Sequence, residues 1–226
     1  RSLYDVVGRV HLRRNCAKRR NTSWFLNGRH DFDEIVEALQ ELPADGGGWD
    51  GAIAVMRAGD RASAIGAVEM LGMLADEDDS PSGRRALARA AGLLIARHGP
   101  LEPEVRTAVL EVVDPTFPTG RFEADRGLVE VLVALDAPDT AGRTLDLVAD
   151  AASPSEAMHF LHALRLLDAE GWDEASRSRA VAALDAASTW SGGASLPGFV
   201  DAIRRQMLEN LGDEAAARSE EHTSEL

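Results

Sequence analysis

Hydrophobic residues recur every three or four positions from Asp31 to Leu211, the spacing of helices that each bury one face. They do not alternate singly over any run in this range, as they do in a half-buried strand. Proline, glycine and capping residues interrupt the pattern at short intervals. The sequence therefore predicts an all-α fold of about ten short helices, roughly 10–17 residues each.

Capping residues and prolines set the expected limits of the first helices. Asp31 begins one that Pro43 ends, and a glycine-rich turn at 44–48 leads into a helix at 49–58. Asp60 caps the next, whose apolar stripe is Ile65, Val68, Leu71 and Leu74.

The middle of the chain shows the same punctuation. We expect residues 76–83 to form a solvated loop, because four acidic residues precede Ser-Pro-Ser-Gly. The next helix runs from Arg84 to His98 and stops at Gly99-Pro100. Two prolines stiffen the connector around Phe117, which we expect in the core.

The helices fall into pairs of roughly 35–45 residues, the size of HEAT-type repeats. Each such pair buries the apolar face of its neighbour. The pattern therefore favours a HEAT-like α-solenoid of antiparallel pairs over 31–212. A compact non-repeating bundle stays open, because the repeats are degenerate.

The stretch 153–211 is the most informative. Ser153 and Glu156 have the spacing of a capping box, and the helix they start carries His159, His162 and Arg165. A Gly-Trp break at Trp172 leads into a second helix. We expect these elements to form the last helical unit.

A loop joins that second helix to the last one. Gly192 and Gly193 let the chain turn beside Trp190, and Phe199 and Arg204 lie on the last helix. We expect Trp190 and Phe199 to anchor the core. The expected inward stripe is Phe199, Ile203, Met207 and Leu211.

Candidate chemistry is confined to the two histidines. His159 and His162 are three residues apart and can share one side of a helix, but a metal site needs at least a third ligand. The favoured interpretation is structural, with one imidazole bonded to a loop backbone and the other facing water. A metal-binding or enzymatic role for the pair is the alternative. No catalytic motif stands out, so we expect no enzymatic activity, bound metal or cofactor in this chain.

Cys16 is the only cysteine, which excludes a disulfide within the chain. Residues 16–20 lack the second cysteine and the histidine of the C-x-x-C-H haem-attachment motif. Covalent haem is therefore not expected at this position.

Charge is distributed unevenly. The net charge is −14, but residues 1–30 hold eight basic residues and one acidic residue, a net +7. The remaining chain is therefore strongly acidic and repels phosphate backbones, so nucleic acid is not an expected partner. The basic segment is interpreted as a remnant of an upstream element or an irregular segment. No apolar run is long enough to cross a membrane.

The last residues differ from the rest. Residues 213–226 are polar and are expected to be disordered. Residues 218–226 match the translation of a common sequencing adapter, so we expect the reading frame to end artificially; a natural polar tail is the alternative.

Short motifs between about 84 and 211 resemble the HEAT-like helical region of large multidomain haem-binding proteins of planctomycete-type bacteria. They are Arg97-His98-Gly99, 114–118, 132–138, 156–160, Ala163-Leu164-Arg165, Gly171-Trp172, 192–195, Gly198-Phe199 and Ile203-Arg204. The resemblance implies a position between a β-propeller and a c-type cytochrome domain, and an extracytoplasmic or periplasmic location.

These observations lead to one expectation of function. The chain is interpreted as a non-catalytic helical-repeat scaffold, spacer or protein-interaction module from a larger redox protein. Its partner would be another protein or the neighbouring domains of the parent chain.

Overall fold

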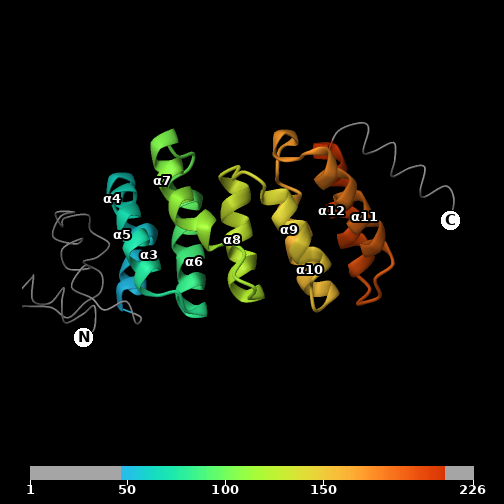
Figure 1. Ribbon diagram of the computed structural model, residues 1–226, viewed down its shortest axis with the longest axis horizontal. Coiled ribbons are helices and arrows are strands. Elements are labelled where there is room, and N and C mark those ends of the chain that lie inside the picture. The colour runs from blue at the N-terminus through green and yellow to red at the C-terminus, as the bar shows by residue number, and fades with distance from the viewer. Residues whose placement is uncertain (1–46, 212–226) are drawn as a thin grey trace, which may run out of the picture. The chain divides into compact units, whose positions relative to one another are not determined.

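The computed structural model describes residues 47–211, and every regular element in that range is a helix (Figure 1). The all-α prediction is confirmed for this part of the chain. None of the helices within it is both long and apolar enough to cross a membrane. The predictions for residues 1–46 and 212–226, including the helix capped by Asp31, Cys16 and the polar tail, lie outside the described residues.

The chain divides into two compact units, with the boundary between Leu128 and Val129. Helix α8 (Phe122–Ala134) contains this boundary. The other helices of the first unit are α3 (Gly47–Ala58), α4 (Arg61–Gly66), α5 (Val68–Glu77), α6 (Pro81–His98), α7 (Pro103–Val113) and the 3₁₀ turn η2 (Asp114–Thr116). Those of the second unit are α9 (Thr140–Ala149), α10 (Pro154–Leu164), η3 (Ala169–Gly171), α11 (Glu174–Ser188) and α12 (Leu196–Leu211).

Two expected boundaries in the first unit are wrong. Helix α3 begins at Gly47, inside the predicted glycine turn. The helix expected after Asp60 is split at Ala67 into α4 and α5. The Asp60 cap itself is confirmed, since its carboxylate accepts a hydrogen bond from Ser63 N at 2.8 Å. Of the expected stripe, Val68, Leu71 and Leu74 are buried, while Ile65 is half-buried.

The predicted loop at 76–83 is also wrong at both ends. Asp76 and Glu77 form the last turn of α5, and α6 begins at Pro81. Ser80 is the N-cap, with Oγ accepting from Gly83 N at 3.1 Å. Proline costs no hydrogen bond in the first turn of a helix, so Ser-Pro starts α6 instead of prolonging the loop.

Asp78 joins three helices of the first unit. Its carboxylate accepts hydrogen bonds from Trp49 Nε1 at 3.0 Å and from Ser80 N at 3.1 Å. The hydrogen bonds from Ser80 lower the pKa of the Asp78 carboxyl, with the Trp49 bond adding to the effect. A Cβ on Gly83 would lie 2.4 Å from the Asp78 backbone oxygen, so the close packing here requires glycine.

Asp125, in the first turn of α8, likewise holds the preceding turn together through its carboxylate. Its side chain is 1% exposed and accepts from Thr119 N at 2.6 Å and Arg121 N at 3.0 Å. These bonds fix the turn between η2 and α8, where Gly120 has a φ of +70°. Phe117 is 5% exposed, which confirms its predicted place in the core.

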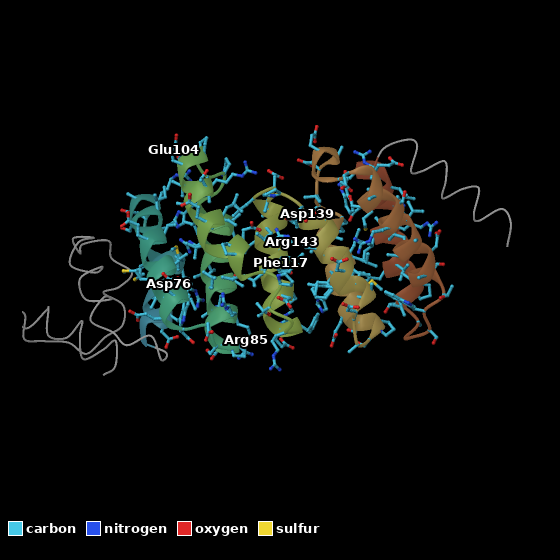
Figure 2. The ribbon with its side chains drawn as sticks, in the orientation of Figure 1. Asp76, Arg85, Glu104, Phe117, Asp139 and Arg143 are labelled. Atoms are coloured by element: carbon cyan, nitrogen blue, oxygen red, sulfur yellow. The ribbon has the colours of Figure 1, made fainter. Side chains whose placement is uncertain are left out.

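The second unit is built from α9, α10, α11 and α12. Helix α9 contacts α10 and α11, and α12 contacts α10 and α11 (Figure 1). Buried side chains of these four helices include Leu145, Phe160, Leu161, Leu164, Leu184, Ile203 and Met207. At the start of α9, Arg143 Nη2 donates to the Pro138 carbonyl at 3.1 Å, beside Asp139 (Figure 2).

Candidate functional site

Helix α10 begins where the sequence predicts, but its cap differs in detail. Ser153 Oγ accepts from Glu156 N at 3.3 Å, which is one half of a capping box. The Glu156 carboxylate accepts from Ala152 N at 3.1 Å instead of Ser153 N. The reciprocal bond of the box is therefore displaced by one residue. The Glu156 side chain therefore acts at the N-terminus of α10 and caps it.

The two histidines of α10 have different surroundings. His159 is exposed, whereas His162 is half-buried and stacks on Phe199 of α12. The ring centroids are 5.5 Å apart and the planes differ by 21°. Burial lowers the pKa of His162, and Arg165 adds to the effect, while Glu130 acts in the opposite direction. His162 is therefore biased toward its neutral form.

Within residues 47–211, no three His, Cys, Asp or Glu side chains are grouped so that they could hold a metal ion. The stack on Phe199 instead gives His162 an aromatic partner.

Phe199 is the clearest error among the predicted core residues. Its side chain is 45% exposed, and the inward position is taken by its neighbour Val200, which is 4% exposed. The buried stripe of α12 is Val200, Ile203, Met207 and Leu211. Consecutive residues differ by about 100° around a helix, so only one of two adjacent apolar residues can point into the core. Phe199 lies at the edge, against His162.

The two tryptophans of the stretch 153–211 differ in burial. Trp172 is 5% exposed, and its Nε1 donates to the Leu167 carbonyl at 3.3 Å. Trp190 is only half-buried, so its predicted role as a core anchor is wrong. Gly192 and Gly193 form the exposed loop after it. A Cβ at Gly192 would come within 2.6 Å of Leu196 Cδ2, whereas a Cβ at Gly193 would meet nothing.

The sequence analysis missed Arg177, which holds the end of α12. Its guanidinium donates to the carbonyls of Leu211 at 2.7 Å, Ala169 at 2.8 Å and Trp172 at 3.3 Å. The last carbonyls of a helix lack partners within the helix, so Arg177 satisfies one of them. No local pattern marks this residue, because Leu211 is 34 positions away.

Two of the predicted residues, Arg165 and Arg204, also lie where α12 meets its neighbouring helices. Arg165 donates to the His162 carbonyl, and its own carbonyl accepts from Asn210 Nδ2 at 2.9 Å. Arg204 pairs with Asp185 of α11 at 2.7 Å, with side chains 19% and 27% exposed. Arg204 therefore ties α12 to α11 through its side chain, whereas Arg165 contacts α12 through its backbone carbonyl.

Two large hydrophobic side chains near α10 and α12 are exposed. Leu166, just after α10, is 61% exposed, and Phe199 is 45% exposed. They are the only large hydrophobic side chains of the second unit, as far as it is described, that are exposed to this degree. Exposed aliphatic and aromatic side chains are suited to binding another protein surface.

Comparison with known proteins gives no match to any family model, curated protein or solved structure.

Proposed function

We propose that the chain is a non-catalytic helical-repeat scaffold that sets the spacing of neighbouring domains or docks a protein partner. The proposal depends on one observation, the register of α12 against the two helices it contacts.

The contacts with α11 support antiparallel pairing. Arg177, near the start of α11, reaches the carbonyl of Leu211 at the end of α12. Asp185, near the end of α11, pairs with Arg204 in the middle of α12. Moving forward along α11 therefore corresponds to moving backward along α12.

The contacts with α10 give α12 a second neighbour. His162, in the last turn of α10, meets Phe199 near the start of α12, and the Arg165 carbonyl accepts from Asn210 near its end. Helix α12 therefore packs on its antiparallel partner α11 and on a helix of the preceding pair, as helices of stacked repeats do. This packing favours a HEAT-like α-solenoid over an irregular bundle.

The bonds from Arg177 and Asn210 also bear on a spacer role. They fix the last turn of α12 to the body of the second unit, which sets the orientation of the helix end. A spacer needs such a fixed end, since a loose terminal turn would not transmit orientation to a neighbouring domain.

Distance measurements between the two units test this role. Spin labels at Arg89→Cys and Ala186→Cys, in a Cys16→Ser background, place one exposed probe on each unit. A spacer predicts one narrow distance distribution by double electron–electron resonance. A broad distribution would contradict it, because two freely moving units cannot set a distance. Two labels within α6, at Arg85→Cys and Arg97→Cys, lie about 18 Å apart along the helix axis and give the width expected for a rigid element.

The alternative is a metal-binding or enzymatic domain that uses His159 and His162. Elemental analysis after incubation with Zn²⁺, Ni²⁺ or Co²⁺ separates the two functions. A stoichiometric metal that is lost in both His159→Ala and His162→Ala would favour the alternative. The scaffold proposal predicts no stoichiometric metal in the unaltered protein.

The resemblance to haem-binding multidomain proteins extends the proposal. The scaffold would stand beside an extracytoplasmic redox domain of a longer parent protein, and the electron transfer would belong to that domain. Reading the uninterrupted frame of the parent gene tests this extension. A C-x-x-C-H motif downstream of the helices is the expected result.

A further inference from the structure

One side of α5 is exposed and acidic. Glu69, Met73, Asp76 and Glu77 recur at helical spacing, and Asp79 lies just beyond the helix end. All five are exposed, and Met73 is 45% exposed. We name these residues the α5 acidic face; Asp76 marks it in Figure 2. It belongs wholly to the first unit.

Few basic residues flank this face. From Ala62 to Gly83 the chain has five acidic residues and no basic residue; Arg61, which pairs with Glu102, precedes this range, and Arg84 and Arg85 follow it on α6. Within residues 47–211, Asp76, Glu77 and Asp79 form no ion pair. Asp76 and Glu77 also lie in the last turn of α5, where the helix dipole favours cations. A cationic partner would therefore relieve an unfavourable arrangement.

We propose that the α5 acidic face is the docking surface for the basic segment 1–30 of the same chain. This segment carries a net charge of +7 and contains the apolar run Trp24-Phe25-Leu26. Its charge complements the carboxylates, and its apolar residues complement Met73. The segment thus carries both kinds of group that the α5 acidic face requires.

The course of the chain brings the two together. Trp49, in the first turn of α3, donates to Asp78, which lies between Glu77 and Asp79. The chain therefore passes beside the α5 acidic face directly after residues 31–46. Sixteen residues reach about 50 Å when extended, so the link is long enough for docking within one molecule. Tethering also raises the local concentration of the segment into roughly the millimolar range.

Zero-length carbodiimide cross-linking tests the contact in the full chain. Lys18 is the only lysine, so its amine and the α-amino group are the only primary amines that can join to a carboxylate, and peptide mapping separates the two. We expect cross-links from Lys18 to Asp76, Glu77 or Asp79. Raising NaCl from about 0.05 M to about 0.5 M should reduce their yield about fivefold, because the Debye length shrinks from about 14 Å to about 4 Å. Cross-links spread equally over carboxylates of both units would overturn the proposal.

Mixing ¹⁴N-labelled and ¹⁵N-labelled protein shows whether the linked residues belong to one molecule. Docking within a chain predicts cross-linked peptides of unmixed isotope content. Peptides of mixed content would assign the segment to a second copy and contradict the proposal.

A nitroxide on Cys16, the only cysteine, gives a readout that does not consume carboxylates. Docking predicts paramagnetic broadening of the Met73 amide. Neutralising the face with Glu69→Gln, Asp76→Asn, Glu77→Gln and Asp79→Asn should abolish the broadening. Neutralising four exposed carboxylates of the second unit should leave it unchanged; they are Asp150, Asp168, Glu170 and Asp201. Equal loss in both variants, with helix content preserved, would indicate a diffuse charge effect and contradict a specific docking surface.

Discussion

Three side chains that each make several hydrogen bonds, Asp78 and Asp125 in the first unit and Arg177 in the second, have opposite chemistry. In the first unit, the carboxylates of Asp78 and Asp125 accept hydrogen bonds, chiefly from backbone N–H groups. In the second unit, the guanidinium of Arg177 donates to three carbonyls. Acceptors suit the N-terminal ends of helices and donors suit the C-terminal ends, because those are the backbone groups left unpaired there.

The difference is also one of reach along the chain. The backbone bonds of Asp78 and Asp125 span 2 to 6 positions. Arg177 to Leu211 spans 34 positions and Asn210 to Arg165 spans 45. A carboxylate that accepts from nearby backbone N–H groups organises its own turn, while a long cationic or amide side chain joins separate helices. In the first unit, the Trp49 bond to Asp78 and the Arg61 bond to the Pro100 carbonyl also join distant elements. Loss of Asp125 should therefore disturb a turn, and loss of Arg177 a helix contact.

Replacing Asp125 with alanine should have the largest effect. The backbone N–H groups of Thr119 and Arg121 would both lose a charged acceptor in a partly buried turn. We expect a loss of about 3 kcal/mol in the free energy of unfolding. Urea denaturation followed by circular dichroism measures it. Asp125→Asn keeps one acceptor oxygen and should lose clearly less, so equal losses would contradict the hydrogen-bond explanation.

Gly83→Ala should come next. The added Cβ would lie 2.4 Å from the Asp78 backbone oxygen and 2.6 Å from its carboxyl carbon, so the turn between α5 and α6 must shift. We expect a loss of about 2 kcal/mol, typical of overpacking. Gly72→Ala is the matched control within α5, where the nearest atom, Val112 Cγ2, lies at 3.4 Å. Alanine there should be neutral or stabilising by up to about 1 kcal/mol, and the reverse order of the two variants would refute this account.

Arg177→Met tests the connection of the second unit. It removes three hydrogen bonds from a partly exposed guanidinium while keeping an apolar stem. We expect a loss of about 1–2 kcal/mol. Amide hydrogen exchange should show the last turn of α12 opening, with the first unit unaffected. Arg205→Met, an exposed position of α12, should leave exchange unchanged.

Local signals make much of the fold predictable. The Asp60 and Ser153 caps, the stop at Gly99 and the burial of Phe117 all depend on residues within a few positions of each other. The errors arise where local signals compete. Ser-Pro after an acidic run is typical of a loop, but the serine cap and N-terminal proline start α6. The apolar stripe is continuous around Ala67 although the helix breaks there.

The candidate site is less predictable. Periodicity cannot decide whether Phe199 or Val200 points inward, because both are apolar and only the placement of α10 selects one of them. The stack of His162 on Phe199 depends on that same placement. The roles of Arg177 and Asn210 leave no signal in the sequence, since their partners are set by tertiary packing and not by spacing.

The smallest expected difference between the two units is in how their stability depends on pH. The pKa of His162 is lowered from its usual 6.5 by burial, so below about pH 6.5 the unfolded chain binds a proton more readily than the folded one. The second unit should therefore lose stability as pH falls from 7 through 6.5, and should lose no more from this group below the folded pKa.

The Asp78 carboxyl affects the stability of the first unit in a more acidic pH range. The pKa of its carboxyl is lowered from 3.8, so its contribution is present above that value and is lost only as pH falls through the lower folded pKa. Between pH 7 and 5, the protection of amides against exchange, corrected for the slower intrinsic exchange at lower pH, should thus fall in the second unit. His162→Gln should remove this dependence and His159→Gln, on the exposed side of α10, should leave it. A dependence that survives His162→Gln would mean that another group of the second unit titrates, and that the stack on Phe199 does not couple α12 to pH.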